Sequence, residues 1–142
     1  MSRSNYSDDC DGPEFYLWRG AVRSAIRGTR GQALLREMRD ALDAMPVKEL
    51  FADGLVAPDG GVCALGVVGE RRGMTDLAAL DPEDSACVAK RFGVAEALVR
   101  ELAFENDEDA PNDPAKRWRW MRDWVEDKLL PPPALAGGEV SS

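Results

Sequence analysis

The chain has 142 residues, of which 44% are hydrophobic and 31% charged, and its net charge at neutral pH is −8. This length and composition predict one soluble globular domain with its own core. No apolar run approaches the roughly 18–20 residues that span a bilayer, and the polar N-terminus lacks the apolar centre of a signal peptide. We therefore expect an intracellular protein without membrane contact.

The chain contains no histidine, and its cysteines Cys10, Cys63 and Cys87 form neither a CxxC knuckle nor a disulfide framework. Catalysis by Ser-His-Asp or Cys-His groups is thereby excluded, as are most zinc sites. Without an activating histidine, Cys63 is expected to be a small buried apolar residue rather than a nucleophile. The GxxxxG run at residues 61–66 is followed by Val67, where nucleotide binding requires lysine. We expect no catalytic residue, no metal ion and no cofactor.

Residues 15–45 are predicted to form two helices joined by a tight turn, on which the rest of the chain packs. The apolar residues of the second helix fall within one arc of roughly 120°. They are Leu34, Leu35, Met38, Ala41, Leu42 and Met45. Gly28 and Gly31 bracket the turn, since glycine tolerates the positive φ of a helix C-terminus, and Pro46 ends the second helix. The short link predicts antiparallel neighbours.

The next segment is predicted to contain a turn and a glycine-rich helix. Residues 58–60 read Pro-Asp-Gly, which is typical of a chain reversal, and we favour a small β-hairpin here over a short helix plus turn. Residues 62–73 are predicted to be a helix that ends at Gly73. Each glycine inside it lowers helix stability by roughly 1 kcal/mol relative to alanine. Close approach by another helix or an aromatic ring is the expected reason.

Three further helices are predicted after a short connector. They are expected over residues 81–92, 95–105 and 115–129, with an acidic loop over residues 105–112. The first starts with Asp81 as its cap and Pro82 as its first residue, and Gly93 separates it from the second. Asp113 and Pro114 repeat the cap-plus-proline start before the last helix.

Together these patterns predict a mainly α protein, a compact single-domain bundle of about five helices with at most a small β-hairpin. The expected organisation is a flexible N-terminal lead (residues 1–12), a helical domain (13–130) and a disordered tail rich in proline and glycine (131–142). No internal repeat is recognised in the sequence.

Four blocks of the sequence resemble a family of small uncharacterised proteins of tailed bacteriophages and prophages. The blocks are YLWRGAVRSAIRGTRGQALLREMRDALDAMP, GGVCALGVVGERRGM, DPEDSACVAKRFGVAEALVRELAFENDE and KRWRWMRDWV. The resemblance covers about residues 4–129. It implies a phage or prophage source and the cytoplasm of a bacterial host, but no activity and no site residues.

The acidic excess is concentrated in one part of the chain. Residues 76–113 contain eleven acids and three bases, a difference that equals the net charge of the whole chain. An acidic balance disfavours general nucleic-acid affinity and allows a basic partner or mimicry of a polyanion. The spacing of an EF-hand is absent. The candidate partner contacts in this segment are Glu105, Asp107, Glu108 and Asp109.

Two further groups of residues are candidate partner contacts. Arg19, Arg23 and Arg27 recur every four residues, and arginine forks suit carboxylates or phosphates. The alternative is that this stripe pairs with the chain's own acids. Trp120 and Trp124 point away from the predicted core face of the last helix. Tryptophan is enriched at binding hot spots, unless another part of the chain covers it.

Residues 85–105 match the packing positions of a helix-turn-helix, with Gly93 in the turn. The expected exposed face of the second helix comprises Ala95, Glu96, Ala97, Arg100, Glu101 and Glu105. Its acids repel phosphates, so a DNA-binding regulator is the weaker alternative. We expect a non-enzymatic protein that binds a host or phage protein, one version being inhibition of a host nucleic-acid-handling or defence system. An enzyme that uses acid pairs and the arginine stripe is a third hypothesis.

Overall fold

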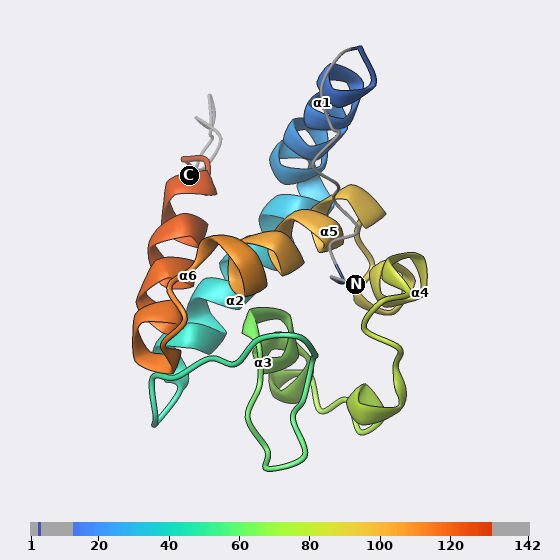
Figure 1. The fold of residues 1–142 in the computed structure, drawn as a ribbon. Coiled ribbons are helices and arrows are strands. Elements are labelled where there is room, and N and C mark those ends of the chain that lie inside the picture. The colour runs from blue at the N-terminus through green and yellow to red at the C-terminus, as the bar shows by residue number, and fades with distance from the viewer. Residues whose placement is uncertain (1–2, 4–12, 132–142) are drawn as a thin grey trace, which may run out of the picture.

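The computed structural model describes Arg3 and residues 13–131, and this part of the chain is mainly α-helical (Figure 1). Its α-helices are α1 (Pro13–Arg27), α2 (Thr29–Ala44), α3 (Ala64–Arg71), α4 (Ser85–Phe92), α5 (Glu96–Phe104) and α6 (Pro114–Lys128). A 3₁₀ turn, η1 (Leu77–Ala79), precedes α4, and a π-helical turn, η2 (Glu105–Asp109), follows α5. The mainly α fold class is confirmed, with six α-helices in the described residues where about five were predicted. The remaining residues of the predicted lead, and residues 132–142 of the predicted tail, lie outside the described residues.

α5 lies at the centre of the bundle, where it contacts α1 and α4, while α2 contacts α3 and α6 (Figure 1). The predicted apolar face of α2 is confirmed, because its residues are buried except for Met45, which is half-buried. Together with Leu98 and Met121 they fill a single core. Each such side chain contributes roughly 1.5–3 kcal/mol on burial. None of the described helices is both long enough and apolar enough to cross a membrane.

α1 and α2 form an elbow rather than the predicted antiparallel pair. They are separated by Gly28 alone, whose backbone is extended with φ −70° and ψ 165°. One extended residue does not reverse the chain, and Figure 1 shows α2 leading away from α1. Gly31 lies in the first turn of α2, where a Cβ would stand 1.9 Å from the carbonyl oxygen of Ala25. Glycine is therefore needed here for close approach and not for a positive φ.

The predicted turn at residues 58–60 is present, but only the first step of a hairpin accompanies it. The Gly60 N–H donates to the carbonyl of Ala57 at 2.9 Å, and Gly60 has φ +92°. Val56 and Val62 form a single antiparallel bridge, with no longer strand in the described residues. The ladder stops there because the residue after Val62 already caps α3.

The glycines of α3 allow close approach, as predicted, by a loop at Gly66 and by the 3₁₀ turn η1 at Gly69. A Cβ on Gly66 would lie 2.0 Å from the carbonyl oxygen of Leu55, and one on Gly69 would lie 2.6 Å from the side chain of Leu77. A loop carbonyl therefore occupies the space at Gly66, and a leucine of the 3₁₀ turn η1 occupies it at Gly69. Gly73 has φ +78° just after the helix, as its predicted end requires.

α4 begins later than predicted, because Asp84 caps it in place of Asp81. The Asp84 carboxylate accepts a hydrogen bond from the Cys87 N–H at 3.1 Å, which satisfies one free donor of the first turn. Asp81 instead accepts from the Glu83 N–H at 2.9 Å and closes a turn before the helix. The helix ends where expected, at Gly93, which has φ +75°.

Candidate binding site

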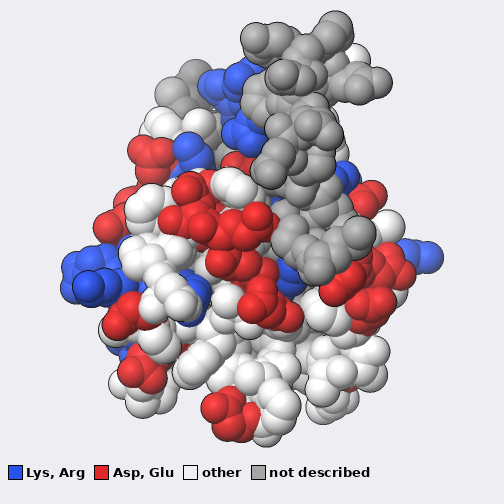
Figure 2. All heavy atoms as spheres, viewed as in Figure 1, with Lys and Arg blue, Asp and Glu red and all other residues white. Residues whose placement is uncertain are grey.

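A groove lies between α1 and the end of α6, with a volume of about 350 Å³. We call it the α1–α6 groove. Its cationic lining residues are Arg19, Arg23, Arg27 and Lys128, its carboxylates are Glu101 and Asp127, and its apolar residues are Val22, Ile26 and Leu130. Figure 2 shows Lys and Arg side chains gathered at the upper end of the molecule, above a group of acids in the middle of the view. The groove thus joins the predicted arginine stripe to residues of two other helices and the segment after α6.

The arginine stripe is only partly neutralised by other residues in the described part of the chain. Arg19 Nη1 lies 3.0 Å from Glu101 Oε1, so the predicted internal pairing holds for this arginine. Lys128 pairs with its neighbour Asp127 at 3.2 Å. Arg23 and Arg27 are exposed and form no ion pair with any other described residue. Among the described residues, Arg23 and Arg27 of the groove are therefore two positive charges without an ion-pair partner.

Trp120 and Trp124 do not form one exposed aromatic face. Trp120 is 37% exposed, and its indole N–H donates to Glu105 Oε1 at 3.0 Å. Trp124 is partly buried against the core, with Lys128 Nζ 5.8 Å from its ring centroid. Other residues of the chain therefore cover Trp124 and one edge of Trp120, which agrees with the alternative to an exposed binding face.

The predicted acidic loop is the π-helical turn η2, and its acids differ in environment. A backbone hydrogen bond of 3.0 Å from residue 110 to the carbonyl of Glu105 continues α5 by one wide turn. Asp107 accepts a hydrogen bond from Arg3 Nη2 at 2.8 Å, and its side chain is only 3% exposed. Glu105 is also buried, which leaves Glu108 and Asp109 exposed. Two of the four predicted acidic contacts thus have buried side chains, because Glu105 bonds to Trp120 and Asp107 bonds to Arg3.

Among the described carboxyl groups, Glu105 has the pKa that is raised furthest above its ordinary value. Its pKa is raised to about 7, chiefly by burial and also by the neighbouring carboxyls of Asp109 and Glu101. The hydrogen bond from Trp120 acts in the opposite direction, since it favours the charged form. Near neutral pH this carboxyl therefore exchanges between its protonated and charged forms.

We expect Glu105→Gln to weaken the pH dependence of stability between about pH 5 and about pH 8. The folded pKa of about 7 exceeds the ordinary value of 4.5, so the native state binds the extra proton. The free energy of unfolding of the wild type therefore falls as pH rises through about 7, by on the order of 1–3 kcal/mol from this group. Glutamine keeps the acceptor for Trp120. Urea unfolding at both pH values measures the difference, and parallel pH curves for wild type and variant would contradict the raised pKa.

α4 and α5 follow the order of a helix-turn-helix, but α5 lacks the free face that a DNA groove would need. Ala97, Glu101 and Glu105 were expected to be exposed, and all three are buried. The reason is that α1 and α4 both pack on α5, which makes it the central helix. This burial counts against DNA recognition by residues 85–105.

Two buried polar residues that sequence reasoning missed hold η2 against the rest of the fold. Asn106 is 1% exposed, accepts from the Ala64 N–H at 3.2 Å and donates to the Phe51 carbonyl at 2.9 Å. Arg117 is 4% exposed and donates to the carbonyls of Asn106 at 2.8 Å and Leu50 at 3.1 Å. Asn106 lies in an acidic run and carries no sequence signal of burial, whereas Arg117 lies one and two helical turns before the buried Met121 and Val125 of α6.

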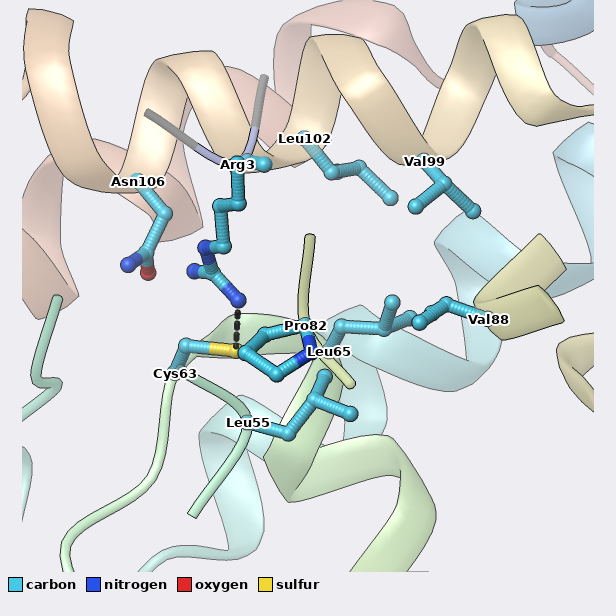
Figure 3. A pocket seen from close by; sticks show the side chains of 10 residues that line it. Arg3, Leu55, Cys63, Leu65, Pro82, Val88, Val99, Leu102 and Asn106 are labelled. Carbon is cyan, nitrogen blue, oxygen red and sulfur yellow. Dashed lines mark hydrogen bonds between the residues drawn. The ribbon is translucent and has the colours of Figure 1, made fainter. Parts of the chain in front are cut away.

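Arg3 belongs to the lead that is expected to be flexible, yet its side chain is buried beside Cys63. Figure 3 shows its guanidinium pointing toward the Cys63 sulfur, with Nη1 3.5 Å from Sγ. Cys63 is itself buried, as predicted, and its sulfur accepts from the Gly66 N–H at 3.3 Å. The free volume here is about 10 Å³, which holds at most one water molecule. We interpret this cluster as a structural contact rather than a ligand site.

Within the described residues, no group of three or more Cys, Asp or Glu side chains is placed to hold a metal ion. Comparison of the chain with protein-family models, curated proteins and solved structures finds no match. The assignment of the α1–α6 groove therefore rests on the residues of this chain alone.

Proposed function

We propose that this chain is a non-enzymatic interaction protein of phage or prophage origin, which binds a host or phage protein in the bacterial cytoplasm through the α1–α6 groove. The phage or prophage origin and the bacterial cytoplasm rest on the resemblance of the four sequence blocks, and one observation carries the choice of the groove. Arg23 and Arg27 line a groove without a carboxylate partner among the described residues, although the chain has 26 acids and 18 bases. Guanidinium groups form their strongest hydrogen bonds with carboxylates and phosphates.

The other groove residues support contact rather than chemistry. Glu101 and Asp127 are its only acids among the described lining residues, and each lies beside a cation, Arg19 or Lys128. Protein partners supply both carboxylates and apolar side chains, which matches the mixed lining. Trp120 is not among the residues that line the groove, and its partly exposed ring is a separate candidate contact.

Affinity capture from a bacterial lysate tests the proposal with three variants. Arg23→Glu/Arg27→Glu reverses the groove charge, and Arg36→Glu/Arg71→Glu makes the same change in net charge on exposed residues of α2 and α3. We expect the first variant to lose a partner that the wild type and the second variant retain. Trp120→Ala is expected to weaken recovery of the same partner. Equal recovery by all of these proteins would remove the groove as the contact surface.

A further inference from the structure

We infer that the α1–α6 groove binds an acidic protein segment in which two carboxylates lie one helical turn apart beside an aliphatic side chain. This inference deepens the proposed function and rests on it. Arg23 and Arg27 are four residues apart on α1, so their Cα atoms are separated by roughly 6 Å along the helix axis. Carboxylates at positions i and i+4 of a partner helix have the same spacing, and each can accept hydrogen bonds from one guanidinium.

The chain itself shows the first member of this pattern. Arg19 lies one turn before Arg23 and already holds a carboxylate from another helix, that of Glu101, at 3.0 Å. Glu101 comes from α5, which crosses next to α1. Acids of a partner placed against Arg23 and Arg27 would continue the row of arginine–carboxylate pairs that Glu101 begins. The three arginines would then be used in the same way along one face of α1.

The apolar part of the lining explains why the segment should also carry an aliphatic side chain. Leu130 lines the groove and is 39% exposed, which makes it one of the few large hydrophobic residues open to solvent in the described chain. Val22 and Ile26 lie beneath the groove and are buried. An aliphatic side chain of the partner placed over Leu130 would remove apolar surface from water, which favours binding by roughly 25 cal/mol per Å² of apolar area.

A nucleic acid fits this lining less well than a protein segment. The groove contains Glu101 and Asp127, and acids gather below it over α5 and η2 in Figure 2. A polyphosphate extends past any groove of this size and would meet those acids, whereas a short acidic segment places its charges only against Arg23 and Arg27.

Fluorescence anisotropy with synthetic peptides tests the inference. The probe is a labelled helical peptide built on Glu-Ala-Ala-Leu-Glu, compared with the same peptide carrying glutamine for both glutamates and with duplex DNA. Wild type and Arg36→Glu/Arg71→Glu should bind the glutamate peptide about tenfold or more tightly than the glutamine peptide, and Arg23→Glu/Arg27→Glu should lose that preference. Circular dichroism and thermal unfolding confirm that each variant is folded.

Three results would overturn the inference. The first is equal affinity for both peptides. The second is tighter binding of DNA than of the peptides, in a way that depends on Arg23 and Arg27. The third is a wild-type dimer that Arg23→Glu/Arg27→Glu separates into monomers, which would place a second copy of the chain in the groove. Loss of peptide binding alone leaves the proposed function standing if lysate capture still depends on Arg23 and Arg27. If Arg23→Glu/Arg27→Glu recovers the same partner from the lysate as the wild type does, the proposed function itself is rejected.

Discussion

Arg117→Met is expected to lower the free energy of unfolding by about 3–5 kcal/mol. The Arg117 guanidinium lies inside the protein and donates to the Asn106 carbonyl at 2.8 Å, to the Leu50 carbonyl at 3.1 Å and to Asn112 Oδ1 at 3.3 Å. Methionine keeps most of the side-chain volume but donates no hydrogen bond. Buried carbonyls would lose their partners without access to water, and α6 would lose its tie to η2.

Arg119→Met is the matched control, because Arg119 lies two residues along the same helix and is exposed. Its expected effect is within about 0.5 kcal/mol of zero. Unfolding of both variants in guanidinium chloride measures the two free energies of unfolding. Similar losses for Arg117→Met and Arg119→Met would show that the buried hydrogen bonds of Arg117 contribute nothing specific.

Gly66→Ala is expected to destabilise the protein by about 3 kcal/mol, in spite of the better helix propensity of alanine. The added Cβ would stand 2.0 Å from the carbonyl oxygen of Leu55, which is a backbone atom and cannot rotate away. That carbonyl also accepts from the Cys63 N–H at 3.3 Å, at the start of α3. The loop and the helix must separate, which disturbs packing on both.

Gly20→Ala, also at a glycine inside a helix, is expected to stabilise the protein, in contrast to Gly66→Ala. A Cβ on Gly20, inside α1, would have no atom within 4 Å apart from its chain neighbours and the backbone of its own helix. Alanine should therefore stabilise the protein by about 0.5–1 kcal/mol through helix propensity alone. Thermal unfolding of both variants gives the comparison. A stabilising Gly66→Ala would contradict the close approach of Leu55 to α3.

The features that the sequence predicts correctly depend on neighbouring residues. The apolar face of α2 follows from helical periodicity over adjacent turns. Asp113 accepts from the Lys116 N–H at 2.9 Å and caps α6, and Pro114 occupies the first turn, both as the local pattern predicts. Gly93 ends α4 because its own backbone adopts a positive φ.

The features that it misses depend on residues far apart in sequence. The acids of η2 suggest a solvated loop, but Arg3 pairs with Asp107 across 104 positions and Asn106 bonds to Phe51 across 55. These partners make a buried helical turn stable in a strongly polar segment. Arg19, Arg23 and Arg27 recur every four residues, so helical periodicity predicts one wall of the groove, as it predicts the apolar face of α2. The opposite wall of the groove, which includes Leu130, depends on where α6 ends in the fold, so the sequence pattern does not predict it.

Hydrogen exchange of the protein, alone and with a captured partner, most directly tests contact through the α1–α6 groove. We expect slower exchange in residues 19–27 of α1 and in residues 127–130, with unchanged exchange in α3. Protection that appears only elsewhere, with α1 exchanging at its free rate, would contradict binding through the groove.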